Sequence, residues 1–239
     1  MPLGNTALQA VLGLEGIQDR RGYLYYSDRY PGLPIIPTVH PSFILRGNQP
    51  WCGAWIRDVG LGVQVALGQR PASPRRELAI DIPNIYSWQA QWSTRGHPFM
   101  AVDIETLRWA DEEHESEGPL TRIGFAYRWQ GTTYALSIPW STACAGLTTC
   151  LLKHGALVWN RHFDFPRLRE KGVEIGHPQH DVQEMWHLFQ PDLPKKLAFA
   201  GCWLVPGQPY WKDLHKEQPG YYNAVDAAVT AEGYEVLYG

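Results

Sequence analysis

The sequence predicts an α/β protein built on a mixed β-sheet flanked by helices. Residues 99–106 form an apolar run with β-branched residues that ends in charge, which is typical of a buried strand. Residues 122–128 and 132–139 are strand-like and flank Gln130-Gly131, a plausible hairpin turn. A short apolar strand at 156–160 then alternates with helical segments. An antiparallel meander followed by strand–helix alternation favours a mixed sheet of three antiparallel and then parallel strands.

The other elements follow from local composition and periodicity. The N-terminal part is predicted to contain a helix at 6–12, strands at 22–26 and 33–39, and a long helix at 51–68. This small, partial α/β unit is too short to close a sheet of its own. The later helices are expected at 164–171, closed by Gly172, and at 183–190, 195–205 and 221–237.

Composition divides the chain into two units and excludes several classes of protein. Residues 69–77 and 92–98 are rich in proline and small polar residues, so we expect units at 1–68 and 97–239 joined by a linker at 69–96. Residues 1–96 carry nine Arg, no Lys and six acids, whereas residues 97–239 carry net charge −6. The 44% hydrophobic content excludes a disordered chain, and the net charge of −3 excludes a basic, non-specific nucleic-acid binder.

The sequence does not indicate a cysteine-based metal site, a disulfide framework, a signal peptide or a membrane span. The four cysteines show no CxxC pair and no finger spacing, which argues against zinc, an iron–sulfur cluster and a disulfide framework. We expect no signal peptide and no membrane span, and hence a cytoplasmic protein of a bacterium or a phage-infected host cell. The acidic run Asp111–Glu117 is interpreted as a solvated loop or, alternatively, a partner-binding patch.

Two carboxylates end the first buried strand. Asp103 and Glu105 are two residues apart, so their side chains lie on one face of the strand. Such a pair repels and loses solvation, and a hard divalent cation such as Mg²⁺ or Mn²⁺ relieves both costs. The alternative is a strand that simply ends in solvated acids.

Two further acids accompany helices. Asp164 follows the strand at 156–160 and by itself is interpreted as a helix N-cap. Asp226 lies in the last helix among small apolar residues, where an unpaired carboxylate is costly. Tyr222 lies four residues earlier, on the same helix face. A polar stripe on an amphipathic helix is the alternative.

Together, the order and spacing of these residues resemble the DEDD (DnaQ-like) 3′–5′ exonucleases, which have a ribonuclease H-like fold and include phage DNA polymerase proofreading domains. The matching motifs are Asp103-Ile-Glu105-Thr106, Asn160-x-x-Phe163-Asp164-x-x-x-Leu168 and Tyr222-x-x-x-Asp226. The resemblance covers about residues 97–239, and Tyr222 four residues before Asp226 indicates the tyrosine subtype. Asp181 and Asp213 stand outside the motifs and are interpreted as structural or surface residues.

The resemblance implies two divalent cations, Mg²⁺ or Mn²⁺, held by Asp103, Glu105, Asp164 and Asp226. It implies that Asp103 bridges both ions, that Glu105 and Asp226 hold the ion that activates the attacking water, and that Asp164 supports the second ion. Tyr222 would orient that water, since an ordinary tyrosine is too weak a base. Expected substrate contacts, by motif or by position, are Thr106, Leu107, Asn160 and Phe163. The cations Arg161, Arg167, Lys195, Lys196 and Lys212 are candidates for phosphate contact, although each is otherwise an ordinary surface charge.

The first unit resembles the C-terminal half of a family-4-like uracil-DNA glycosylase, through residues 3–46 and His40-Pro41-Ser42 in particular. The N-terminal half of that family, which positions the attacking water, has no counterpart in residues 1–68. We therefore expect no glycosylase activity from this chain. An incomplete sheet is expected to expose apolar surface, which predicts self-association or a partner such as an upstream glycosylase-like protein.

The combined prediction is a metal-dependent 3′–5′ exonuclease acting on the 3′ end of single-stranded or frayed DNA, in proofreading, replication or repair. One alternative is a DNA- or partner-binding module whose activity needs an absent polymerase or glycosylase half. A second is an exoribonuclease of the same superfamily, since only contacts to the 2′-OH distinguish RNA from DNA.

Overall fold

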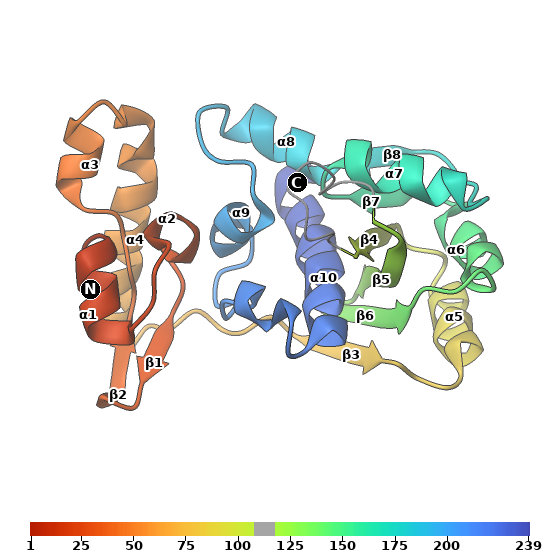
Figure 1. The fold of residues 1–239 in the computed structure, drawn as a ribbon, viewed down its shortest axis with the longest axis horizontal. Helices are drawn as coiled ribbons and strands as arrows, with labels where there is room; N and C mark the ends of the chain where they lie inside the picture. Colours follow the sequence, from red (N-terminus) through yellow and green to blue (C-terminus); the bar gives the residue numbers. More distant parts are fainter. Residues whose placement is uncertain (108–117) are drawn as a thin grey trace. The chain divides into compact units, whose positions relative to one another are not determined.

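The computed structural model describes residues 1–107 and 118–239, so the acidic run Asp111–Glu117 lies outside the described residues (Figure 1). The chain forms two compact units. The first consists of Met1–Pro74 and Trp186–Tyr210, and the second of Arg75–Met185 and Trp211–Gly239.

The second unit contains a six-stranded mixed sheet in the order β3-β6-β5-β4-β7-β8. Its strands are β3 Arg76–Ile80, β4 Met100–Thr106, β5 Leu120–Trp129, β6 Thr132–Pro139, β7 Ala156–Val158 and β8 Gln179–Asp181. Strands β4, β5 and β6 are antiparallel, while β7 pairs parallel with β4 and β8 pairs parallel with β7. The predicted mixed α/β sheet is thus confirmed, as is the hairpin, where Gln130 and Gly131 both take positive φ.

One face of this sheet carries small residues and is covered by helix α10, Pro219–Tyr238 (Figure 1). Gly124 and Ala126 of β5 and Ala135 of β6 alternate with bulky residues that face the other way. On its buried side, helix α10 also carries small residues, mainly alanines. Because neither surface has large side chains, the helix backbone approaches the sheet closely, and polar groups on the two can meet.

The other face carries the main hydrophobic core. Trp88 and Trp92 pack there with Val102, Phe125 and Leu168. The helices that supply this layer are α5 Ile85–Thr94, α6 Cys144–Leu152 and α7 Arg161–Glu170. The alternation of side chains along β4 therefore sends Val102 and Ile104 into this core and leaves Asp103 on the face of α10.

The first unit is mostly helical, with one two-stranded sheet. Its elements are α1 Asn5–Leu12, α2 Ile17–Arg20, β1 Tyr25–Ser27, β2 Tyr30–Ile35, α3 Pro41–Leu45, a 3₁₀ turn Gln49–Trp51, α4 Cys52–Ala66 and α9 Leu197–Leu204. A buried ion pair between Arg21 and Asp58 ties α2 to α4, and the phenol of Tyr23 donates a 2.5 Å hydrogen bond to the carbonyl of Ala198. Helix α8, Val182–Phe189, begins in the second unit and ends in the first.

Two expectations about domain organisation are wrong. Residues 69–96 are not a linker over most of their length, because they contain β3 and α5; β3 pairs parallel with β6, and α5 buries Trp88 and Trp92 in the core. Residues 97–239 are not one unit either, because Trp186–Tyr210 packs with the N-terminal residues. The ring of Phe199 meets that of Trp51 at 5.0 Å, a contact between residues far apart in sequence.

The His40-Pro41-Ser42 sequence begins α3, where His40 Nδ1 accepts a hydrogen bond from the backbone amide of Ser42. Cys144 and Cys202 are buried, and all four cysteines are free. Among the described residues, no helix combines the length and the apolar character that crossing a membrane requires.

Candidate active site

Three carboxylates meet where β4 lies under α10. Asp103 and Glu105 project from the same face of β4, and Asp226 projects from the buried side of α10. Ligand oxygens of these three side chains all lie within 4.8 Å of one another. The period of the strand and the small residues beneath α10 together bring about this convergence.

Asp164 lies beside these three carboxylates and bonds to the end of β4 that β7 leaves unpaired. Strand β7 ends at Val158, which pairs with Val102, so the ladder does not continue to Ile104. The amide of Ile104 donates instead to Asp164 Oδ1 at 3.1 Å. Asp164 is 3% exposed and lies in the first turn of α7, whose N-cap is Asn160. The interpretation of Asp164 as the N-cap is therefore wrong, and its carboxylate points to the sheet.

Asp181 fixes the start of α7. Its carboxylate accepts hydrogen bonds from the amides of Asn160 and Arg161 at 3.1 and 2.7 Å, and from the amide of Gln183 at 2.9 Å. Asn160 takes a left-handed backbone conformation with φ of 76°, which these bonds stabilise. Asp181 thus has the structural role expected for it, and it holds the turn from which Asp164 projects.

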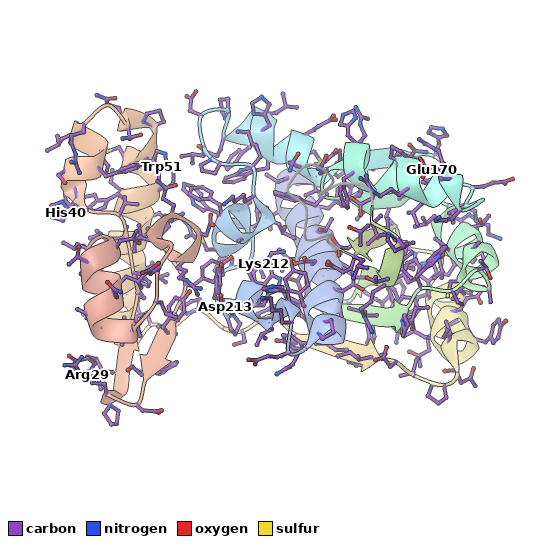
Figure 2. All side chains as sticks on the ribbon, viewed as in Figure 1. Arg29, His40, Trp51, Glu170, Lys212 and Asp213 are labelled. Carbon is purple, nitrogen blue, oxygen red and sulfur yellow. The ribbon has the colours of Figure 1, made fainter. Side chains whose placement is uncertain are left out.

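A lysine forms hydrogen bonds with Asp226, the acid that α10 contributes. Lys212, which is labelled in Figure 2, lies on the short 3₁₀ helix Lys212–His215. Its ammonium group donates to both oxygens of Asp226, at 2.8 and 2.6 Å. Trp211 Nε1 donates to the same carboxylate at 2.5 Å. Lys212 also donates to the hydroxyl of Tyr222 at 3.0 Å, so the phenol proton of Tyr222 remains available as a donor.

Burial and mutual repulsion set the charge state of the cluster. Burial, followed by the charges of Asp226, Glu105 and Asp164, raises the pKa of Asp103 well above its ordinary value. Burial likewise raises the pKa of Asp164, against the hydrogen bond from Ile104. Burial and then Asp226 raise the pKa of Tyr222, which keeps its phenol protonated near neutral pH.

These donors suit a hard divalent cation. The cluster offers only oxygen ligands, and burial among like charges raises the pKa of Asp103 and Asp164, so a compensating cation would favour their ionised forms. Asp103, Glu105 and Asp226 are the residues that would hold such an ion, with Asp164 beside them. A cation there would supply Lewis acidity and stabilise negative charge on a phosphate.

The predicted substrate residues are divided among several places. Thr106 lines a hollow of about 400 Å³ together with Leu120, Pro166, Arg167 and Lys171. Phe163 is partly buried under the guanidinium of Arg167, 3.9 Å from its ring centre. Leu107 is half exposed, and its amide bonds the carbonyl of Pro119.

Among the cations proposed for phosphate contact, Lys212 bonds Asp226, and the charge of Arg167 acts on Asp164. Arg161 pairs with Glu184 at 2.9 Å. Lys195 and Lys196 belong to the other unit, where Lys195 bonds the carbonyls of Gln190, Pro191 and Leu193, and Lys196 pairs with Asp19.

Sequence reasoning missed two polar residues next to the cluster. Asn223, fully buried on α10, donates to Asp103 Oδ2 at 2.8 Å, and Ser137 of β6 donates to Asn223 Oδ1 at 2.7 Å. The position of Asn223 beside Tyr222 in a predicted helix was an available signal. Ser137 gives no signal in the sequence, because a serine in a strand is ordinary.

No protein-family model matches the chain, and no curated protein matches it significantly. Solved structures do match. RNase D of Trypanosoma brucei, determined in complex with RNA U12, superposes with a TM-score of 0.52 at 12% identity over 69% of this chain and 63% of that chain. The fold of the present chain is therefore shared with that ribonuclease, and the chain spans less than two thirds of its length.

Two further structures are less similar. The catalytic core of RRP6 from T. brucei gives a TM-score of 0.48 at 14% identity, over 96% of this chain and 64% of that chain. NrnC of Brucella melitensis with bound Mg²⁺ gives 0.42 at 14% identity, over 70% of this chain and 81% of that chain.

Proposed function

We propose that the chain is a metal-dependent 3′–5′ exonuclease that hydrolyses the terminal phosphodiester bond at the 3′ end of a nucleic acid, with DNA as its substrate. The observation that carries the proposal is the convergence of Asp103, Glu105 and Asp226 within 4.8 Å, beside Asp164, at the positions of three ordered motifs. The fold shared with an RNase D supports the same reaction class.

Each residue has a role that its surroundings permit. The carboxylates of Asp103, Glu105 and Asp226 bind divalent cations, Mg²⁺ or Mn²⁺, in the arrangement that the motif resemblance implies. Tyr222 donates its phenol proton to orient the attacking water, because its raised pKa prevents it from acting as a base. Lys212 already neutralises Asp226 and is placed to hold that carboxylate and Tyr222 in register.

A second candidate is an exoribonuclease. It is favoured by one observation, the RNA in the RNase D structure that shares this fold. DNA is preferred in this proposal because the sequence of residues 1–68 led us to expect a resemblance to part of a uracil-DNA glycosylase. A role in phage replication or proofreading, and a partnership with a polymerase, stay predictions that depend on the motif resemblance.

A polarity assay tests the proposal. The full chain is incubated with 5′-labelled single-stranded DNA, or RNA of the same sequence, in Mg²⁺ or Mn²⁺. We expect a ladder that shortens from the 3′ end, is lost with EDTA, and forms faster on DNA. Faster shortening of RNA would establish the exoribonuclease instead. A chain that binds the oligonucleotide without cleaving it in either metal would favour the binding module.

Variants connect the activity to the cluster. Asp103→Ala and Asp226→Ala are expected to lower the rate at least about 100-fold, while Tyr222→Phe lowers it less. Asp213→Asn is the matched control, because this acid is exposed on the 3₁₀ helix and lies outside the carboxylate cluster. Wild-type cleavage by Asp103→Ala would contradict the metal assignment.

A further inference from the structure

A continuous chain of hydrogen bonds leads from the sheet to Asp103. Ser137 Oγ accepts from Arg122 Nε at 3.2 Å and donates to Asn223 Oδ1 at 2.7 Å. The amide Nδ2 of Asn223 then donates to Asp103 Oδ2 at 2.8 Å and to the Asp103 carbonyl at 3.2 Å. Because the backbone carbonyl oxygen of Asp103 can only accept, Asn223 must present its NH₂ group to Asp103 and its Oδ1 to Ser137, whose hydroxyl therefore donates.

The far end of this chain is held by an ion pair. Arg122 Nη2 donates to Oδ1 of Asp81, the residue immediately after β3, at 2.5 Å. A Cβ on Gly220, in the first turn of α10, would lie 2.9 Å from the Arg122 guanidinium. The absence of a side chain at Gly220 therefore leaves room for Arg122 beneath the start of α10.

The sheet also leaves room for the amide. A Cβ on Gly124 would lie 2.8 Å from both the carbonyl and Oδ1 of Asn223, closer than real atoms approach. Asn223 and Ser137 are each fully buried, so neither side chain finds water as a substitute partner. The pocket for Asn223 is therefore specific in both shape and hydrogen bonding.

From this geometry we infer that Asn223, oriented by Ser137, is a positioning residue that holds Asp103 in the rotamer needed for cation binding. The inference rests on the proposed function, since it concerns the same metal site. With Oδ2 held by Asn223, rotation of the Asp103 carboxylate breaks a partly buried hydrogen bond, so its orientation relative to Glu105 and Asp226 is preserved. Partners behind metal ligands commonly change metal affinity about 10- to 100-fold.

The same strand and helix supply a matched control. Thr133 of β6 is also fully buried and donates a 2.7 Å hydrogen bond to Glu232 of α10. Ser137→Ala and Thr133→Val each remove one buried hydroxyl between β6 and α10, but only Ser137 connects to Asp103. A purely structural role would make the two variants equivalent.

The test measures Mn²⁺ binding by calorimetry on the full chain, together with the thermal midpoint without metal. Asn223→Ala is expected to weaken Mn²⁺ binding about tenfold and Ser137→Ala severalfold, while Thr133→Val leaves it unchanged. In cleavage assays, the Mn²⁺ concentration for half-maximal rate should rise in the first two variants, and excess Mn²⁺ should restore their rate.

The outcomes separate this inference from the proposed function. If the wild type binds Mn²⁺ and cleaves while Ser137→Ala and folded Asn223→Ala bind Mn²⁺ within twofold of it, the positioning role is refuted and the exonuclease stands. Equal weakening by Ser137→Ala and Thr133→Val also refutes it. If the wild type binds no Mn²⁺, the metal site and the inference fail together. Should Asn223→Ala not fold, the comparison of Ser137→Ala with Thr133→Val decides alone.

Discussion

Replacing Asp103 with asparagine should stabilise the metal-free protein while abolishing its metal site. Asn has the same shape, and its oxygen can still accept the hydrogen bond from Asn223. Its NH₂ group then faces the neighbouring carboxylates and turns a repulsion into an attraction. Burial and like charges raise the pKa of Asp103, so ionised Asp103 is unfavourable in the folded state without a cation.

The magnitude follows from the spacing of the cluster. Two unit charges 4.8 Å apart repel by about 3.5 kcal/mol at an effective dielectric constant of about 20. Proton uptake by Asp103 relieves part of this repulsion, and Lys212 offsets the charge of Asp226. We therefore expect Asp103→Asn to raise the free energy of unfolding by about 1–3 kcal/mol, with a rise in Tm of about 2–4 °C for each kcal/mol.

The sign of the pH dependence follows from the raised pKa. A carboxyl whose folded pKa lies above its unfolded pKa binds more protons in the folded state. Its favourable contribution is complete below the unfolded value and disappears as pH rises through the folded value. The stability advantage of Asp103→Asn over the wild type should therefore grow as pH rises above the ordinary carboxyl range.

Thermal unfolding in EDTA at several pH values is the assay, with Glu174→Gln, an exposed acid of the same unit, as control. Saturating Mn²⁺ should reverse the order, because a ligand at about 1,000 times its Kd stabilises the wild type by about 4.1 kcal/mol and the variant lacks the site. A metal-free Asp103→Asn that is no more stable than Glu174→Gln at pH 8 would refute the reasoning.

Two further predictions concern the structure around the cluster. Gly124→Ala should destabilise the second unit by about 1–3 kcal/mol in chemical denaturation, because its Cβ would meet Asn223. The control Gly146→Ala, at an open position of α6, should be neutral or stabilising. Equal effects of the two variants would contradict the close packing of α10 on the sheet. Asp181→Ala should lower the free energy of unfolding by about 1–3 kcal/mol, because the start of α7 loses its hydrogen bonds to this carboxylate. Cleavage should also slow, since α7 carries Asp164. A destabilised variant that cleaves at the wild-type rate would show that Asp181 does not position Asp164.

The local elements of the second unit could be predicted because their causes are local. The apolar run of β4, the Gln130-Gly131 turn and the long helix α10 each depend on residues close in sequence. The pairing of Asp103 with Glu105 on one face needs only the two-residue period of a strand. The carboxylate motifs could be recognised for the same reason, since their order and spacing are properties of the chain itself.

The elements that were missed are those whose stability comes from distant partners. Residues 69–96 have the composition of a linker, but β3 is stabilised by hydrogen bonds to β6 and α5 by the burial of two tryptophans. Trp186–Tyr210 follows the helices of the second unit in sequence, yet Phe199 packs against Trp51 of the first. Neither the structure of residues 69–96 nor the unit to which Trp186–Tyr210 belongs can be predicted from a sequence periodicity, because both depend on which surfaces are complementary.

The site shows the same division. By itself, the sequence determined which carboxylates the chain offers and which of them share a strand face. Only the tertiary structure decided that Lys212 pairs with Asp226, that Asp164 turns to the amide of Ile104, and that Ser137 and Asn223 fix Asp103. The physical reason is that the buried charges and amides of this site obtain their hydrogen-bond partners from several separate segments of the chain, and such partners become adjacent only when the helices pack on the sheet.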